Sequence, residues 1–164
     1  MADNEPRLKA VYDCNVFLQG LVNAQSPSNR CLDFWLTGVI TIYVTRPILV
    51  EIRNVLLRPE LQDKFANLTY ERVEALFNSL GQKAILLEAV PTHFRFERDI
   101  KDEPYLNLAI GSGAQYVVSR DNDLLDLMRR ADPVSNAFRT AYPGIAIVDP
   151  VAFIDIVSNT TSEQ

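Results

Sequence analysis

The sequence is poor in the residues that build several common kinds of metal site. Histidine occurs once, at His93, and cysteine occurs twice, at Cys14 and Cys31. This scarcity excludes a site built from several histidines and argues against a zinc site with cysteine and histidine ligands. If a metal ion binds, carboxylate oxygens must hold it, and such ligands favour Mg²⁺ or Mn²⁺.

The sequence also lacks a long apolar run. No window approaches the roughly 18 apolar residues of a membrane span, and no apolar stretch of signal-peptide length occurs near the start. Two cysteines without a secretory signal fit a reducing compartment in which both thiols stay free. We therefore expect a cytoplasmic protein that does not associate with a membrane.

Positive charge is scarce as well. The 164 residues include 16 lysines and arginines against 21 acids, for a net charge of −5. This balance argues against a broad electropositive surface. If a nucleic acid is the substrate, something other than the summed side-chain charge must attract it, and a bound cation is the obvious candidate.

Length and apolar content indicate one globular domain that alternates strands and helices. Apolar residues make up 48% of the chain and charged residues 23%, the balance of a soluble domain. Short apolar segments typical of strands occur at Leu8–Asp13, Ile40–Thr45, Ala84–Leu87, Tyr116–Ser119 and Ile145–Val148. We therefore predict a three-layer α/β/α sandwich with a mainly parallel central sheet of about five strands.

Helical patterns separate the strand segments. They occur at Ser28–Thr37, Arg46–Leu57, Thr69–Leu80, Pro104–Gly111, Asp123–Arg130 and Pro150–Val157. Gly81 stands in the stop position of the third of these helices. We expect a single domain over residues 1–157, followed by a polar tail, 158–164, that frays.

Acidic side chains follow two of the predicted strands. Asp13 ends the first, and both Asp121 and Asp123 stand beyond another. Asp123 is a candidate N-cap of the next helix, but capping accounts for one of these two aspartates better than for both. Ligands of an open parallel sheet bind beyond the carboxyl ends of its strands. We therefore expect these carboxylates near a binding site.

Further acids have a simple structural interpretation. Asp102 and Glu103 open a helix, where acids commonly oppose the helix dipole, so capping is the first explanation for them. Glu51 lies on the apolar side of its helix, and an ion pair with Arg53 or Arg58 would account for it.

Convergence of these acids at one edge would require a counter-charge. Carboxylates within about 5 Å of each other repel by around 3 kcal/mol per close pair at an effective dielectric constant near 20. A stable fold does not usually gather them without a cation, or without protonating some of them. Divalent ions with oxygen ligands solve that problem, and two such ions roughly 3.5–4 Å apart form a phosphodiester cleavage site.

Four segments of the sequence form a recognisable series. They are VYDCNVFLQGL, ILVEIRNVLLRPEL, RDIKDEPYLNLAIGSGAQYVVSRDNDLLDL and IAIVDPVAFI, and they cover most of residues 8–154. The strongest signals are the strand that leads into D-x-N and the segment A-x-Y-V-V-S-x-D-x-D-L-L. This series resembles the PIN-domain family, in particular the branch described as toxin components of toxin–antitoxin systems.

The resemblance implies a small α/β/α domain that holds Mg²⁺ or Mn²⁺, with two ions expected, and cuts RNA to leave a 5′-phosphate. The metal-binding and catalytic acids it implies are Asp13, Glu51, Asp102 and Asp121, with Asp123 sharing or replacing the role of Asp121. Asn15 and Ser119 match polar positions that orient the acids or a bound water, and Glu103 is the substitute for Asp102. The resemblance also implies an antitoxin protein that blocks the cleft, and a homodimer.

Two other functions stay open on the sequence. A non-catalytic member of the fold would act by binding RNA or a partner, although no acid of the expected set is missing. A different Mg²⁺-dependent enzyme, of the phosphotransfer or phosphatase kind, would need a lysine beside a phosphoacceptor aspartate, and Lys83 and Lys101 are the nearest options. Basic residues that could contact RNA phosphates are Arg46, Arg53, Arg58, Arg120, Arg129 and Arg130.

Overall fold

The structure, a computed structural model, describes residues 7–162. Five parallel strands form the central sheet of this part of the chain. They are β1 (Leu8–Tyr12), β2 (Ile40–Val44), β3 (Ile85–Leu86), β4 (Tyr116–Val118) and β5 (Ala146–Val148). The strands pair in the order β3-β2-β1-β4-β5, and every pairing is parallel. The predicted sheet is confirmed. The first strand stops at Tyr12, one residue earlier than expected, because Asp13 already caps the helix that follows.

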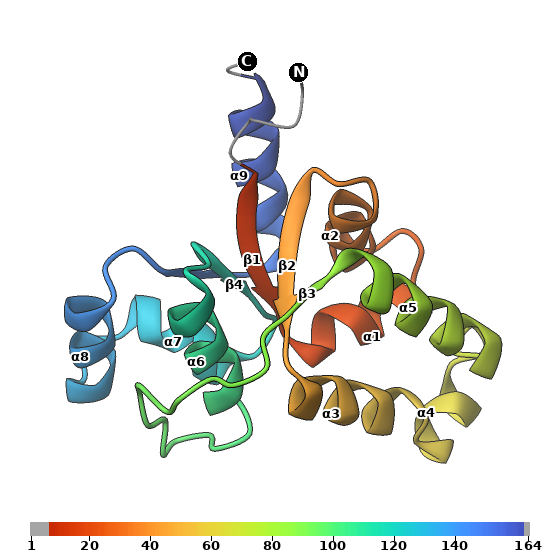
Figure 1. Cartoon of the computed structure of the whole chain (residues 1–164), viewed down its shortest axis with the longest axis horizontal. Coiled ribbons are helices and arrows are strands. Elements are labelled where there is room, and N and C mark those ends of the chain that lie inside the picture. Colours follow the sequence, from red (N-terminus) through yellow and green to blue (C-terminus); the bar gives the residue numbers. More distant parts are fainter. Residues whose placement is uncertain (1–6, 163–164) are drawn as a thin grey trace.

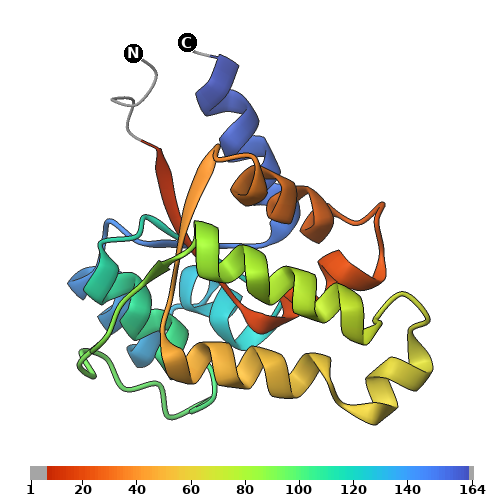
Figure 2. The ribbon, with the colours of Figure 1, turned by 45° about the vertical axis from the view of Figure 1, so that its right-hand side comes forward.

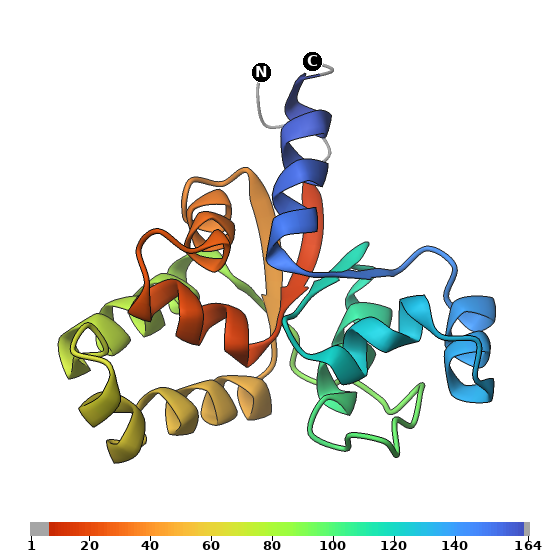
Figure 3. The same ribbon diagram turned by 180° about the vertical axis from the view of Figure 1, so that it is seen from behind.

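Helices cover both faces of this sheet. Over residues 7–162 they are α1 (Cys14–Val22), α2 (Pro27–Leu36), α3 (Arg46–Leu56), α4 (Pro59–Lys64), α5 (Tyr70–Lys83), α6 (Glu103–Ser112), α7 (Asn122–Arg129), α8 (Pro133–Ala141) and α9 (Pro150–Ser162). α6 packs on β1, β2 and β4, whereas α2 contacts both α1 and α9 on the opposite face (Figures 1 and 3). These are the three layers of the predicted α/β/α sandwich.

Several helix boundaries differ from the sequence-based prediction. α1, α4 and α8 were not predicted, and the predicted stop at Gly81 is wrong because α5 continues to Lys83. Gly81 has a negative φ, whereas Gly113 ends α6 with φ of 73°, the left-handed conformation that glycine adopts readily. α9 continues to Ser162 and therefore includes most of the expected tail. Residues 163–164 lie outside the described part.

Buried apolar side chains and a few polar contacts hold the layers together. Val11, Ile42 and Val117 on the central strands are at most 1% exposed. Figure 2 shows α3 and α5 side by side, and an ion pair between Arg53 and Glu74 joins them. Among residues 7–162, no helix is both long enough and apolar enough to cross a membrane.

A buried asparagine anchors the long loop that leads into α6. The side-chain oxygen of Asn107, Oδ1, accepts hydrogen bonds from the backbone N–H groups of His93 and Phe94, at 2.7 and 2.8 Å. Its amide group donates to the carbonyl oxygens of Phe94 and Glu103, at 2.9 and 3.1 Å. The three bonds to His93 and Phe94 tie the loop to α6, whereas the bond to Glu103 lies within the helix, just after Asp102.

Candidate active site

The carboxyl ends of β1 and β4 bring two of the predicted site residues together. Tyr12 is paired with Val118 in the sheet, so the next residues, Asp13 and Ser119, are also neighbours. The Asp13 N–H donates to the Val118 carbonyl at 3.0 Å, and the Ser119 hydroxyl donates to Asp13 Oδ2 at 2.7 Å. Adjacent parallel strands thus place a carboxylate at the edge predicted for the site.

Asp13 is buried and held by three hydrogen bonds. Its side chain is the N-cap of α1, with Oδ1 accepting the Cys14 N–H at 2.7 Å. Oδ2 accepts the Ser119 hydroxyl and also the Asn15 amide, at 3.2 Å. Asn15 reaches further, because its Oδ1 accepts the Arg120 N–H at 3.1 Å. The two polar residues expected to orient the acids, Asn15 and Ser119, therefore both contact Asp13.

Asp121 follows β4 and caps α7. Its Oδ1 accepts the Asp123 N–H at 2.8 Å, and its own N–H donates to the Ser119 hydroxyl at 2.9 Å. The prediction that Asp123 is the N-cap of this helix is therefore wrong. Asp123 lies inside the first turn of α7, and the cap is Asp121. One serine hydroxyl thus connects the first strand's aspartate with the backbone of the fourth strand's aspartate.

Asp102 does not behave as a capping residue. It precedes α6, but its side chain accepts no hydrogen bond from the first turn of that helix. The residue is 6% exposed, and its Oδ2 is buried without a hydrogen-bond partner in the described chain. Asp102 therefore occupies the N-cap position, as the sequence suggested, but no capping hydrogen bond accounts for its side chain. A buried carboxylate oxygen without a partner is costly, and such atoms occur in sites that bind a ligand.

These three aspartates converge. One carboxylate oxygen from each of Asp13, Asp102 and Asp121 lies within 4.8 Å of the other two. A second group, of Asp99, Asp121 and Asp123, satisfies the same criterion and shares Asp121 with the first. The structure therefore places acids from β1, β4 and the start of α6 at one edge of the sheet, where their charges repel.

Burial and repulsion raise the pKa values of two of these acids. The pKa of Asp13 rises to about 6, chiefly because the group is buried, although hydrogen bonds from Ser119 and the Cys14 N–H oppose the rise. The pKa of Asp102 rises to about 9 because of burial first, and then because of the charge of Asp13 and contact with the Asp121 carboxyl group. Both shifts mean that the charged forms lack a compensating positive charge.

Glu51 approaches the same edge from α3 but belongs to neither group of three acids in the described chain. Its Oε2 accepts a hydrogen bond from the buried Tyr105 hydroxyl at 3.1 Å. The alternative that it pairs with Arg53 or Arg58 is wrong, because Arg53 pairs with Glu74 and no ion pair of residues 7–162 includes Glu51. Its charge acts on the aspartates: after burial, it is among the causes that raise the pKa of Asp13.

Two further acids, Glu103 and Asp99, lie near Asp102 in the chain. Glu103, the expected substitute for Asp102, lies outside both acidic groups in the described residues, although its Oε1 is buried without a partner. Asp99 was not predicted, because it lies in a charged run that resembled a solvated loop. It stands one turn before Asp102, whose N–H donates to the Asp99 carbonyl at 3.2 Å. The D-x-x-D spacing was the signal that could have identified it.

The donor set fits a hard divalent cation. All the converging atoms are carboxylate oxygens, which suit Mg²⁺ and Mn²⁺. Within residues 7–162 no lysine or arginine forms an ion pair with Asp13, Asp102 or Asp121. The Asp102 oxygen without a partner is the atom that a cation would satisfy. The acids at this edge could therefore hold a cation, and no lysine or arginine of the described residues neutralises them through an ion pair.

Comparison with known proteins agrees with this architecture. The crystal structure of PAE2754 from Pyrobaculum aerophilum matches with a TM-score of 0.52 and 14% identity, over 93% of this chain and 90% of that chain, a likeness of fold. The uncharacterized protein MJ1680 of Methanocaldococcus jannaschii is 28% identical over 121 residues, which are 74% of this chain and 76% of the relative. A family model of the PIN domain matches residues 9–123. Because that match spans most of the chain, the protein belongs to the PIN-domain family, whose fold is of the nuclease type.

Proposed function

We propose that this protein is a metal-dependent endoribonuclease that hydrolyses RNA phosphodiester bonds. The observation that carries the proposal is the convergence of Asp13, Asp102 and Asp121 within 4.8 Å, with Asp102 Oδ2 buried and without a partner. Membership of a family with a nuclease-type fold supports the same reaction class. An acidic protein acting on an acidic polymer needs a cation between them, and this cluster is where such a cation fits.

Asp13, Asp102 and Asp121 would hold Mg²⁺ or Mn²⁺, and Asp123 and Glu51 would complete the ligands for two ions. Bound there, the ions would supply an activated water and neutralise charge on the phosphate. The second acidic group, which shares Asp121 with the first, supports a count of two ions.

The remaining residues hold the acids in place. A carboxylate offers about four lone-pair positions, and Asp13 uses three of them for Cys14, Asn15 and Ser119. This leaves a defined direction for a further ligand. The Ser119 hydroxyl also accepts the Asp121 N–H, so a single side chain sets the spacing between two of the proposed ligands. Polar partners of this kind typically tune metal affinity.

The finer parts of the proposal rest on the resemblance described above. They are cleavage that leaves a 5′-phosphate, a toxin role with an antitoxin partner that blocks the site, a homodimer, and a cytoplasmic location. The phosphotransfer alternative gains no support from the site. In the described chain, the Asp13 carboxyl group accepts hydrogen bonds from Cys14, Asn15 and Ser119 and is repelled by Asp121 and Glu51, with no lysine among these residues.

The test is cleavage of a panel of labelled RNAs and single-stranded DNAs with Mg²⁺, Mn²⁺ or a chelator. Intact protein is compared with Asp13→Asn, which keeps an acceptor oxygen for the Cys14 N–H, and with the exposed control Asp63→Asn on α4. We expect metal-dependent cutting of RNA that Asp13→Asn removes and Asp63→Asn retains. Cutting that survives Asp13→Asn would refute the site, and cutting of DNA alone would refute the substrate.

A further inference from the structure

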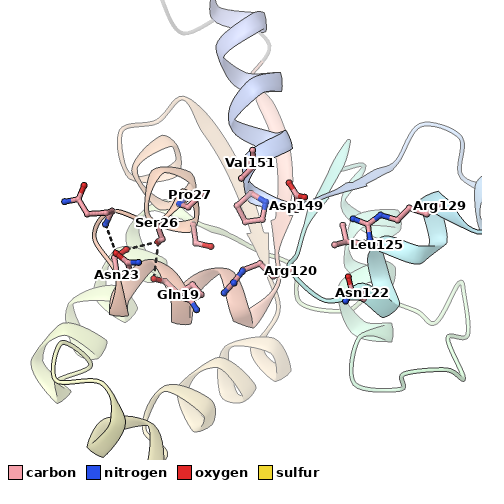
Figure 4. A pocket seen from close by; sticks show the side chains of 13 residues that line it. Gln19, Asn23, Ser26, Pro27, Arg120, Asn122, Leu125, Arg129, Asp149 and Val151 are labelled. Atoms are coloured by element: carbon pink, nitrogen blue, oxygen red, sulfur yellow. Dashed lines mark hydrogen bonds between the residues drawn. The ribbon is translucent and has the colours of Figure 1, made fainter.

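An open pocket of about 580 Å³ is lined in part by Arg120 and Asn122, the residues before and after Asp121 in the chain. It lies between the carboxyl end of α1, the start of α2, α7 and the start of α9 (Figure 4). Leu125, Pro27 and Val151 supply apolar surface, while amide and guanidinium groups supply polar contacts. Binding sites for small organic groups have volumes of about 300–1,000 Å³, so this pocket has room for a nucleotide.

The segment that leads from β4 into the first turn of α7 is shared by the cluster and the pocket. Its residues alternate: Asp121 and Asp123 belong to the acidic groups, whereas Arg120 and Asn122 line the pocket. Successive Cα atoms are about 3.8 Å apart. For an RNA bound at the acids, the adjoining nucleotide would therefore reach the pocket.

α1 connects the same two places. Asn15 and Gln19 are four residues apart on α1, so they lie on one side of the helix, and Asn23 is the C-cap that follows it. Asn15 bonds to Asp13 at the acidic end, whereas Gln19 and Asn23 line the pocket. With a rise of 1.5 Å per residue, Asn15 and Gln19 are about 6 Å apart along the helix axis. α1 therefore leads from the proposed ligands to the pocket.

The pocket is locally positive in an acidic protein. Arg120 and Arg129 both line it, and within residues 7–162 neither forms an ion pair. Figure 4 shows Arg120 extending toward Gln19 and Arg129 projecting from α7. The one acid in the lining, Asp149, accepts the Ala152 N–H at 2.8 Å. Two guanidinium groups without a carboxylate partner are suited to a phosphate.

We infer that this pocket binds the nucleotide of a single-stranded RNA that adjoins the cleaved bond. Arg120 and Arg129 contact its phosphate, and the amides of Gln19, Asn23 and Asn122 contact its base and sugar. This inference rests on the proposed function for the choice of RNA as the ligand. It assigns the attraction of the polymer to two arginines as well as to the metal.

The test measures binding without cleavage. A fluorescent single-stranded RNA of about eight nucleotides is titrated, in chelator and at several salt concentrations, with intact protein, Arg120→Gln, Arg129→Gln and Arg130→Gln. Arg130, a candidate phosphate contact on the sequence, is the matched control, because the structure places it outside the pocket and pairs it with Asp132. We expect each pocket variant to bind about tenfold more weakly and to lower the salt slope by about one. Arg130→Gln should bind as the intact protein does.

Equal binding by all three variants would overturn the inference, and so would the absence of RNA binding by the intact protein. The proposed function is judged separately, by cleavage with metal. Cleavage together with binding that ignores Arg120 and Arg129 would leave the nuclease and remove the pocket. Binding that depends on both arginines, without cleavage under any metal, would leave the pocket and remove the nuclease.

Discussion

Carboxylates in two regions of this molecule have opposite surroundings. On the surface, Glu74 pairs with Arg53, and Asp132 lies 3.5 Å from both Arg98 and Arg130. The pKa of Asp132 is lowered, first by its hydrogen bonds with Ser135 and then by those arginines. At the edge of the sheet, by contrast, acids meet other acids. The pKa values of Asp13 and Asp102 rise, and no arginine or lysine in the described residues forms an ion pair with either of them.

The two regions differ in whether a basic side chain neutralises the acids. The chain has 16 basic residues and uses several of them to neutralise surface acids. The fold leaves Asp13 and Asp102 buried beside each other, which costs stability in the absence of a cation. Clusters of acids with raised pKa values are typical of functional sites rather than of structural ones. If the cluster binds a cation as proposed, the cost in folding stability is offset when that cation binds.

The largest expected effect is the loss of a carboxylate from the acidic cluster, compared with the loss of one carboxylate from a surface ion pair. We expect Asp102→Asn to lower metal-dependent RNA cleavage by about 10³-fold or more, because a ligand is lost. Glu74→Gln removes a partly exposed ion pair and should change the cleavage rate less than about twofold. Initial rates at saturating metal measure both. Similar losses in the two variants would show that stability, not a ligand, explains the effect.

The next effect concerns the hydroxyl that joins two of the acids. Ser119→Ala removes the 2.7 Å bond to Asp13 and the acceptor of the Asp121 N–H. We expect metal affinity to fall by about 10–100-fold, and the free energy of unfolding to fall by about 1–3 kcal/mol. Calorimetric metal titration and urea unfolding measure these quantities. Ser135→Ala, a buried serine on α8, is the control and should lose stability without losing metal affinity.

The pH dependence of stability should have opposite signs in the two regions. In metal-free protein, folded Asp13 and Asp102 keep their protons to about pH 6 and 9, whereas unfolded aspartates lose them near pH 4. The unfolded state therefore binds fewer protons over this range, and the free energy of unfolding should fall as pH rises from about 4 to 9. Asp132, with a lowered pKa, contributes in the opposite direction.

Urea midpoints of metal-free protein at pH 5 and pH 8 test this sign. Asp102→Asn should flatten the fall and raise stability at pH 8 by about 1–2 kcal/mol, or roughly 2–8 °C in Tm. Asp63→Asn, exposed on α4, should keep the slope of the intact protein. Stability that rises between pH 5 and 8, with Asp102→Asn less stable than the intact protein, would mean that the cluster already has a counter-charge.

The edge of the sheet at which the site lies could be predicted from the sequence. Apolar segments marked the strands, and the carboxyl ends of parallel strands lie at one edge, so the pattern placed Asp13 and Asp121 there. The role of Ser119 came from the resemblance, and the pairing of β1 with β4 required the structure. The role of Asp102 could not be predicted in this way. An acid before a helix looks the same in sequence whether or not it caps, and its burial depends on the loop that Asn107 anchors.

Other misses have the same origin. The sequence near the start of α7 offers both Asp121 and Asp123 as caps, and only the backbone path after β4 decides between them. α1 was missed because its apolar residues continue those of β1, which hides the change of period. Without that helix, the common side of Asn15 and Gln19 could not be recognised. The pocket therefore required the structure.

The smallest effect should come from the hydroxyl that holds Glu51. Tyr105→Phe keeps the buried ring and removes only the 3.1 Å bond to Glu51 Oε2. We expect the cleavage rate to fall about threefold, because Glu51 gains rotational freedom but keeps its charge, and the unfolding free energy to fall by about 0.5–1.5 kcal/mol. Tyr142→Phe is the control. The Tyr142 hydroxyl bonds to the His93 carbonyl at 3.3 Å, and its loss should leave the rate unchanged.

If Tyr105→Phe cleaves as the intact protein does while Glu51→Gln is inactive, Glu51 acts without help from Tyr105. If both variants are fully active, Glu51 resembles the surface acids and lies outside the functional cluster.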